Sequence, residues 1–269
     1  RRMGGRREPA LPSGGYMAGQ FDGRVALVTG GNAGIGKATA LLFAAKGAKV
    51  AIAARRETEG EQTVAEIRDN GGDAAFFQVD VRNGSEVEAL VGSVIDRYGR
   101  LDHAFNNAGV AAGGSIHEMT EETWDRVIDI NLKGVWLSMK HELPPMLEQG
   151  FGTIVNNASM LGLAGSAGSA PYTASKHGVV GLTKCAAMEY GRKGIRVNSI
   201  CVGLVETDMT HGMIEGIRER DAVASINPLE RIGAPHEVAE AVVWLSSDAA
   251  SFINAEAMRI DGGALARGG

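Results

Sequence analysis

A glycine-rich segment directly after a short apolar run limits the folds open to this chain more than any other feature. The run is VALV at 25–28 and the segment is TGGNAGIG at 29–36, so the pattern predicts a strand, a tight turn and a helix that begins near Ile35. Glycines in such a turn let backbone amides and the positive end of the helix approach a pyrophosphate. We therefore expect a dinucleotide to contact Gly30, Asn32, Gly34, Ile35 and Gly36.

Apolar runs and amphipathic stretches alternate along most of the chain, with short connections between them. Strands are predicted at 24–29, 49–53, 74–79, 101–106, 153–157, 196–200 and 257–260, and helices at 35–46, 58–70, 85–98, 122–147, 172–191 and 235–246. This alternation predicts an α/β fold, a Rossmann-like, doubly wound parallel sheet of about seven strands with helices on both faces. Ligands of such sheets bind beyond the carboxyl ends of the strands. We interpret residues 21–269 as one domain and residues 1–20, which are rich in arginine, as a disordered leader or a cloning remnant.

The composition narrows the classes of function. No apolar stretch reaches the 18 or so residues of a membrane span, and a net charge of −5 argues against binding to nucleic acid. The two cysteines, Cys185 and Cys201, suit a reducing cytoplasm better than a disulfide framework. The six histidines are scattered and show no metal-ligand spacing. These observations favour a cytoplasmic protein that has no membrane span, does not bind nucleic acid and uses no catalytic metal.

Ser159, Tyr172 and Lys176 are placed to act together on one reacting carbonyl. If Tyr172 opens a helix, Lys176 lies on the same face one turn later. A free tyrosine has a pKa of about 10, and a cation about 6 Å away favours the phenolate by roughly 2.8 kcal/mol, which lowers that pKa by about two units. The phenol then becomes a usable acid and base near neutral pH. Tyrosine–lysine pairs at this spacing are common on solvated helix faces. The pair therefore indicates a catalytic site only in combination with the other motifs.

The glycine-rich segment, NNAG at 106–109, Asn131, Ser159 and YxxxK at 172–176 occur together in one order. In these motifs the chain, from about residue 21 to residue 263, resembles the short-chain dehydrogenase/reductase superfamily, in its single-domain branch. The resemblance implies a Rossmann-fold catalytic domain of an NAD(P)-dependent oxidoreductase that interconverts a ketone and a secondary alcohol by hydride transfer. It implies the catalytic set Asn131, Ser159, Tyr172 and Lys176. Asn131 is alternatively a simple helix kink or a buried amide.

The resemblance also implies the remaining cofactor contacts. Asp80 and Val81 are expected to meet the adenine, although Asp80 could equally cap the following helix. Three residues are expected to form the wall behind the adenosine ribose: Asn106, Ala108 and Gly109. Thr207 is expected to touch the carboxamide, and further contacts are expected at Asn107, Tyr172, Lys176, Gly203 and Val205. The long connection at 204–231 corresponds to the substrate loop, whose residues either line the pocket or pack on the surface: His211, Met213 and Ile214.

The resemblance further implies a homotetramer, with interfaces on the helices that begin near 122 and 172 and on the last strand. Two short segments depart from the family pattern. Val202-Gly203 stands where Pro-Gly is usual, and Asn254-Ala255 stands where Thr-Gly is usual. Both departures concern the shape and rigidity of turns, and neither removes a catalytic group.

The end of the second predicted strand indicates which dinucleotide is used. An NAD-specific site places a carboxylate there, which accepts hydrogen bonds from the ribose 2′-hydroxyl. This chain has Ala54 followed by Arg55 and Arg56, and guanidinium groups suit the 2′-phosphate of NADP. NADP(H) is therefore favoured, with both arginines as contacts. NAD(H) stays possible, because Ala33 stands where many NADP-using relatives carry a second basic side chain.

Two other functions remain open. The chain also resembles the 3-oxoacyl-[acyl-carrier-protein] reductases of fatty-acid synthesis, which must dock an acidic carrier protein. The predicted turn at 148–151 carries no positive charge, but Arg192 and Lys193 could supply some. More remotely, a Rossmann fold alone is compatible with a non-catalytic dinucleotide-binding sensor. The complete catalytic set argues against the sensor.

Overall fold

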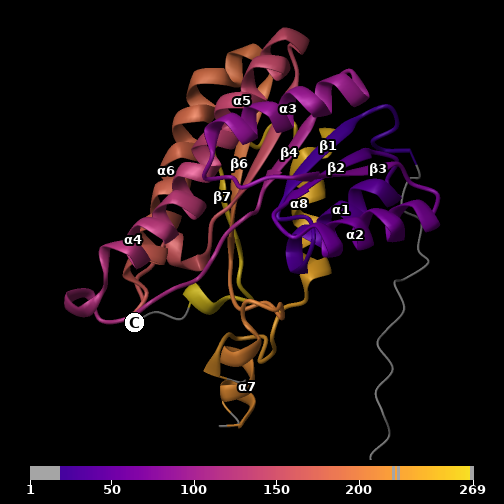
Figure 1. Cartoon of the computed structure of the whole chain (residues 1–269). Coiled ribbons are helices and arrows are strands. Elements are labelled where there is room, and N and C mark those ends of the chain that lie inside the picture. Colours follow the sequence, from indigo (N-terminus) through magenta and orange to yellow (C-terminus); the bar gives the residue numbers. More distant parts are fainter. Residues whose placement is uncertain (1–18, 220–221, 223–224, 267–269) are drawn as a thin grey trace, which may run out of the picture.

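One parallel sheet organises the molecule (Figure 1). The computed structural model describes residues 19–219, 222 and 225–266, so most of the predicted leader lies outside the described residues. The seven strands lie in the order β3-β2-β1-β4-β5-β6-β7, which confirms the predicted doubly wound sheet. Their bounds are β1 (Val25–Thr29), β2 (Lys49–Ala54), β3 (Ala74–Gln78), β4 (His103–Asn106), β5 (Gly152–Asn157), β6 (Ile195–Val202) and β7 (Ala257–Ile260).

Helices cover both faces of the sheet (Figure 1). One layer holds α1 (Gly34–Ala45), α2 (Glu57–Asp69) and α8 (Pro235–Ser246), and the other holds α3 (Gly84–Tyr98), α4 (Glu121–Ile128), α5 (Gly134–Gln149) and α6 (Ala170–Tyr190). Helix α7 (His211–Glu219) projects from the loop after β6. Short 3-10 helices lie at Ile116–Glu118, Met160–Gly162, Gly191–Lys193, Asp248–Ala250 and Ala264–Ala266.

The central strand β1 shows why its sequence is a continuous apolar run. All five residues are buried, and successive side chains point to opposite faces. Val25 and Leu27 pack against the layer of α3, α5 and α6, whereas Ala26 and Val28 pack against the layer of α1, α2 and α8. Because both faces of this strand are buried, its sequence is apolar from Val25 to Val28 and shows no alternation of apolar and polar residues.

The carboxyl ends of the central strands meet at one edge of the sheet. In the β1–β4 and β4–β5 pairings, Thr29 lies beside Asn106 and Asn106 lies beside Asn156. The strand order reverses direction between β1 and β4, which is the position where such sheets bind ligands. The residues that follow, among them Gly30 and Asn107, consequently start the loops of a common site.

The long helix predicted at 122–147 runs without a break over 121–149, but it is not α-helical throughout. A π-helical turn, Asp129–Lys133, separates α4 from α5. Asn131 lies in this turn, and its side chain bonds outside its own helix, as described below. The interruption follows from those contacts, because an insertion in the helical ladder needs partners that compensate for it.

Candidate active site

Two neighbouring cavities open at the carboxyl edge of the sheet, and most of the predicted site residues line them. The first, of about 260 Å³, includes Gly30, Asn32, Gly34, Ile35, Arg56, Asn107, Ala108, Gly109, Ser159, Tyr172, Lys176, Gly203, Val205 and Thr207. The second, of about 350 Å³, shares Gly30, Asn32, Arg56, Ala108 and Gly109 and adds Arg55, Asp80 and Val81. Gly36 and Asn131 lie outside both linings.

The glycine turn is shaped by steric demands that only glycine meets. Gly30 and Gly34 have φ angles of 66° and 52°, in the left-handed region. A Cβ at Gly36 would collide with the carbonyl oxygen of Gly30. Helix α1 begins at Gly34, and its N-cap, Ala33, makes no side-chain cap hydrogen bond. The first amides of α1 are thus available for an anion at the positive end of the helix.

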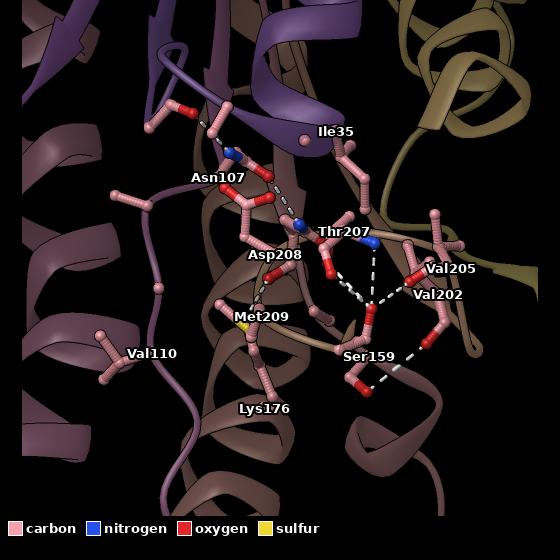
Figure 2. A pocket seen from close by; sticks show the side chains of 18 of the residues that line it. Ile35, Asn107, Val110, Ser159, Lys176, Val202, Val205, Thr207, Asp208 and Met209 are labelled. Carbon is pink, nitrogen blue, oxygen red and sulfur yellow. Dashed lines mark hydrogen bonds between the residues drawn. The ribbon is translucent and has the colours of Figure 1, made fainter. Parts of the chain in front are cut away.

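Ser159, Tyr172 and Lys176 reach the first cavity from β5 and α6, as their spacing predicted. The Lys176 Nζ atom lies 5.5 Å from the centroid of the Tyr172 ring. Ser159 follows β5 in an extended conformation and caps the 3-10 helix Met160–Gly162, where its Oγ accepts from the Leu161 N–H at 3.2 Å. Figure 2 shows Ser159 and Lys176 beside the loop that carries Thr207, Asp208 and Met209.

The predicted lowering of the Tyr172 pKa is wrong for this structure. Burial raises the pKa of the phenol, and the hydrogen bond with the Ser159 side chain offsets only part of that rise. Burial also lowers the pKa of the Lys176 ammonium to about 8. The Nζ donates to the Asn157 carbonyl oxygen at 2.6 Å. Removal of both groups from water therefore outweighs the attraction that the spacing alone suggested.

Asn131 joins the loop after β4 to helix α6. Its side-chain Oδ1 accepts from the Val110 N–H at 2.8 Å, and its Nδ2 donates to the Val110 carbonyl oxygen at 2.9 Å. The Nδ2 also donates to Ser175 Oγ at 3.3 Å. The side chain is fully buried. A buried amide within an interrupted helix, one of the two readings of the sequence, describes this residue, and its catalytic role stays a prediction.

The second cavity carries the charged groups expected around adenosine. Arg82 binds Asp80 through two nitrogens, with the shortest contact, Nη2 to Oδ2, at 2.6 Å, and this interaction lowers the pKa of the Asp80 carboxyl. Helix α3 is capped by Asn83, which accepts from the Ser85 N–H, so Asp80 is not the cap. With the Asn32 amide oxygen turned towards Arg56, that oxygen accepts from Nε at 3.1 Å and from Nη2 at 3.0 Å.

The loop after β6 contributes Val205 and Thr207 to the first cavity, as expected, but not the three residues considered for the substrate pocket. His211 and Met213 are exposed on α7, and Ile214 is fully buried; none of the three lines the first cavity. Asp208, Met209 and Thr210 line it instead. Thr210 Oγ1 accepts from the Thr207 N–H at 3.0 Å, and this contact turns the chain towards the cavity. Asn157 also lines the first cavity and was not predicted there, although its position at the end of a predicted strand, two residues before Ser159, could have identified it.

Within residues 19–219, 222 and 225–266, no helix is long and apolar enough to cross a membrane. In the same part of the chain, no group of three or more His, Cys, Asp or Glu side chains could hold a metal ion.

Comparisons with known proteins agree with this geometry. A family model described as enoyl-(acyl carrier protein) reductase matches residues 30–264. The chain is 42% identical over 250 residues to 2,5-dichloro-2,5-cyclohexadiene-1,4-diol dehydrogenase of Sphingobium indicum, with 90% of this chain and 97% of that protein covered. It is 41% identical over 242 residues to 3-oxoacyl-[acyl-carrier-protein] reductase of Synechocystis sp., with 89% and 96% covered.

A solved structure shares the fold as well as the sequence pattern. The crystal structure of actinorhodin polyketide ketoreductase with NADPH aligns with a TM-score of 0.86 at 40% identity, over 92% of this chain and 99% of that one. The chain therefore belongs to the short-chain dehydrogenase/reductase family of NAD(P)-dependent oxidoreductases, as its motifs predicted.

Proposed function

We propose that this chain interconverts a ketone and a secondary alcohol in the first cavity, with Tyr172 as the acid and base. The observation that carries the proposal is the meeting of Ser159, Tyr172 and Lys176 in a cavity whose other wall is the glycine turn. A bound nicotinamide dinucleotide would supply or accept the hydride. The turn fits such a group, because its glycines leave a cradle that a Cβ would fill and helix α1 presents uncapped amides.

In the reductive direction, Tyr172 gives its phenolic proton to the carbonyl oxygen of the substrate as the hydride arrives at carbon. Ser159 donates a hydrogen bond to the same oxygen and stabilises its developing charge. The nearby Lys176 ammonium stabilises the resulting phenolate, and it would also hold the ribose hydroxyls of a bound nicotinamide dinucleotide. With a pKa of about 8, it can also exchange a proton with solvent near neutral pH. Asn131, through Val110 and Ser175, holds the wall beside these groups.

NADP(H) is the proposed dinucleotide. Arg55 and Arg56 line the second cavity beside Ala54, where a carboxylate would favour NAD(H). Asp80 lines the same cavity, but its charge is compensated by Arg82. NADPH should therefore give a higher kcat/KM than NADH, and Ala54→Asp should lower the NADPH-to-NADH ratio by about tenfold or more. A wild-type preference for NADH by tenfold would contradict the assignment.

The proposed substrates are neutral ketones and alcohols of apolar, ring-type compounds. Val110 and Met209 supply apolar surface to the cavity that Ser159, Tyr172 and Lys176 also line, and a relative that shares 42% identity is named for a cyclohexadiene diol. The second candidate is a 3-oxoacyl-[acyl-carrier-protein] reductase, which the Synechocystis relative favours. It would use Arg192 and Lys193, after α6, to bind an acidic carrier protein.

One screen separates these candidates. The wild-type protein is mixed with NADPH or NADH and with a panel that contains cyclic ketones and a 3-oxoacyl thioester, and absorbance at the nicotinamide band is followed. Turnover of cyclic ketones without capture of a carrier protein supports the first candidate. Thioester turnover together with carrier capture supports the second. Dinucleotide binding without turnover of any substrate would contradict both enzyme assignments and would favour the non-catalytic sensor.

We also propose a cytoplasmic homotetramer. Cys185 and Cys201 are both free thiols, which suits the reducing environment of the cytoplasm. Trp124 on α4 and Trp136 on α5 are 41% and 46% exposed, and contact between helices of different subunits would cover these rings. Light scattering at micromolar concentration should give a mass near four chains, and a stable monomer would contradict the assembly.

A further inference from the structure

Asn157, the last residue of β5, contacts both halves of the site. Its carbonyl oxygen accepts from Lys176 Nζ at 2.6 Å. Its side-chain Nδ2 donates to Asn107 Oδ1 at 2.8 Å. The residue is half-buried and lines the first cavity. One residue therefore bonds the catalytic ammonium through its backbone and a neighbouring strand end through its side chain.

Asn107 continues the connection to the glycine turn. Its Nδ2 donates to the carbonyl oxygens of Thr29 and Gly30, both at 3.2 Å, and its backbone N–H donates to Thr29 Oγ1 at 3.0 Å. A Cβ at Gly30 would lie only 2.9 Å from the same Nδ2. Because Nδ2 faces two carbonyl oxygens, the Asn107 Oδ1 must face Asn157. Asn157 must then present its NH₂ group, which determines the orientation of both amides.

We propose that Asn157 is a positioning residue that holds Lys176 in register with the glycine turn. The chain of hydrogen bonds runs from Lys176 through Asn157 and Asn107 to Gly30, across the ends of β5, β4 and β1. Resting on the proposed function, this connection couples the groups that bind the nicotinamide end of the cofactor to those that bind its phosphates. Loss of the Asn157 amide should therefore weaken cofactor binding and shift the catalytic ammonium together.

A second asparagine pair, one residue earlier on the same strands, serves as an internal control. Asn106 Nδ2 donates to Asn156 Oδ1 at 3.0 Å, and Asn156 Nδ2 donates to Thr183 Oγ1 at 3.0 Å. Asn106 and Asn156 are buried and line neither cavity. Since successive strand residues point to opposite faces, this pair braces the sheet against α6 without contacting the site. Its loss should reduce stability and leave cofactor affinity unchanged.

The test compares Asn157→Leu, Asn157→Asp and Asn156→Leu. Leucine removes the amide at similar size and keeps the backbone carbonyl. Aspartate keeps the shape of the side chain but has no N–H to donate to Asn107 Oδ1. Rotation of the Asn107 amide by 180° would not restore the hydrogen bond without cost, because its oxygen would then face the carbonyl oxygens of Thr29 and Gly30. A steric role would thus be preserved by aspartate, whereas a hydrogen-bonding role would be lost.

The readouts are the NADPH dissociation constant from nicotinamide fluorescence, kcat and KM, the pH profile of kcat, and Tm. Both Asn157 variants should raise the dissociation constant by about threefold to tenfold and shift the pH profile. Asn156→Leu should lower Tm with a dissociation constant within about twofold of wild type. If the Asn157 variants bind NADPH as tightly as wild type, the inference fails. If wild type itself neither binds a dinucleotide nor reduces a ketone, the proposed function fails instead.

Discussion

The two edges of the sheet treat buried charge in opposite ways. At the amino edge, the fully buried Asp102 accepts from Arg24, from Arg100 and from the Val25 N–H at 2.6 to 2.9 Å. Burial alone would raise the pKa of the Asp102 carboxyl, but these hydrogen bonds together lower it. At the carboxyl edge, Lys176 is also buried and donates to a neutral carbonyl oxygen.

This difference between Asp102 and Lys176 indicates that one buried charge serves the stability of the fold and the other serves the reaction. A buried charge whose partners are complete contributes to the fold and has no reason to change its protonation state. The Lys176 ammonium forms no ion pair with any carboxylate of the described residues, and burial lowers its pKa to about 8. Titration near neutral pH is what proton transfer requires, and perturbed groups in a cavity are typical of active sites. Changes at the carboxyl edge should therefore affect turnover, and changes at the amino edge should affect folding.

The largest expected effect is at the carboxyl edge. Tyr172→Phe removes the proposed proton donor and keeps the ring, so kcat should fall by about 10² to 10⁴ while Tm and NADPH affinity are retained. Tyr190→Phe, at the far end of the same helix, is the matched control and should turn over like wild type. Steady-state kinetics and thermal unfolding of both variants give the measurement. Full activity of Tyr172→Phe would show that Tyr172 is not the catalytic acid.

At the amino edge the expected effect is on folding. Asp102→Asn leaves two guanidinium groups without their carboxylate, which should lower the free energy of unfolding by about 3 kcal/mol, near the lower end for a broken buried pair. The lower end applies because the side chains of Arg24 and Arg100 are 35% and 39% exposed and keep contact with water. Urea unfolding measures the loss, with the exposed Asp69→Asn as control.

The kcat of the folded Asp102→Asn protein should match wild type if the two edges are independent. A variant that unfolds like wild type but loses turnover would show that charge at the amino edge reaches the site, and the comparison between the edges would fail.

The sequence predicted what depends on local spacing and missed what depends on distant partners. The glycines at 30, 34 and 36 and the pair Tyr172–Lys176 are local, because turn geometry and helix periodicity follow from a few neighbouring residues. The seven strands followed from their buried apolar runs. The π-helical turn at Asn131 depends on Val110, 21 residues away in the chain, and no periodicity signals that contact.

Burial was the other quantity that the sequence did not contain. The Tyr172 pKa rises because the folded chain removes the phenol from water, which a distance to Lys176 cannot express. The role of Asn157 depends in the same way on Asn107, which another strand brings within 2.8 Å. The sequence left open which residues of the loop after β6 reach the cavity, because a turn at Thr210 determines which side chains point there.

The two edges should also respond oppositely to pH. At the amino edge, burial lowers the pKa of His103 from 6.5 to about 3, so its contribution to stability is complete above pH 6.5 and is lost as pH falls towards 3. Beneath the carboxyl edge, burial raises the pKa of Glu142 from 4.5 to about 7, so its contribution is complete below pH 4.5 and is lost as pH rises to 7. Between pH 4.5 and 6.5 the two slopes oppose each other.

Glu142→Gln isolates the carboxyl-edge slope. The Asn106 Nδ2 donates to Glu142 Oε2 at 3.0 Å, while Asn106 Oδ1 and Glu142 Oε1 are buried without a partner among the described residues. A glutamine can donate to the Asn106 oxygen and carries no charge, so the variant should gain about 1 kcal/mol in the free energy of unfolding at pH 8 and little at pH 4.5. Denaturation at the two pH values tests it against the exposed Glu148→Gln. If Glu142→Gln changed the free energy of unfolding equally at both pH values, a group other than Glu142 would be responsible for the titration.

The smallest expected effect is at Ala255, which lies before β7 on the amino side of the sheet. Its φ angle is 64°, in the left-handed region, at the position where the family pattern has glycine. The neighbouring Asn254 holds this conformation, because its Oδ1 accepts from the Val197 N–H at 2.9 Å and its Nδ2 donates to the Ala187 carbonyl oxygen at 3.1 Å. The backbone at Ala255 is therefore imposed by its neighbours and costs about 1 kcal/mol in strain.

Ala255→Gly relieves that strain, and part of the gain is offset by the greater freedom of glycine in the unfolded chain. The free energy of unfolding should rise by about 0.5 kcal/mol, which corresponds to an increase in Tm of about 1 to 2 °C for a domain of this size. Ala257→Gly, in the adjoining strand with ordinary backbone angles, should lower Tm instead. Both variants should keep the kcat of wild type, since neither reaches the carboxyl edge. A fall in Tm for Ala255→Gly would mean that the methyl group at this turn contributes more through packing than it costs in strain.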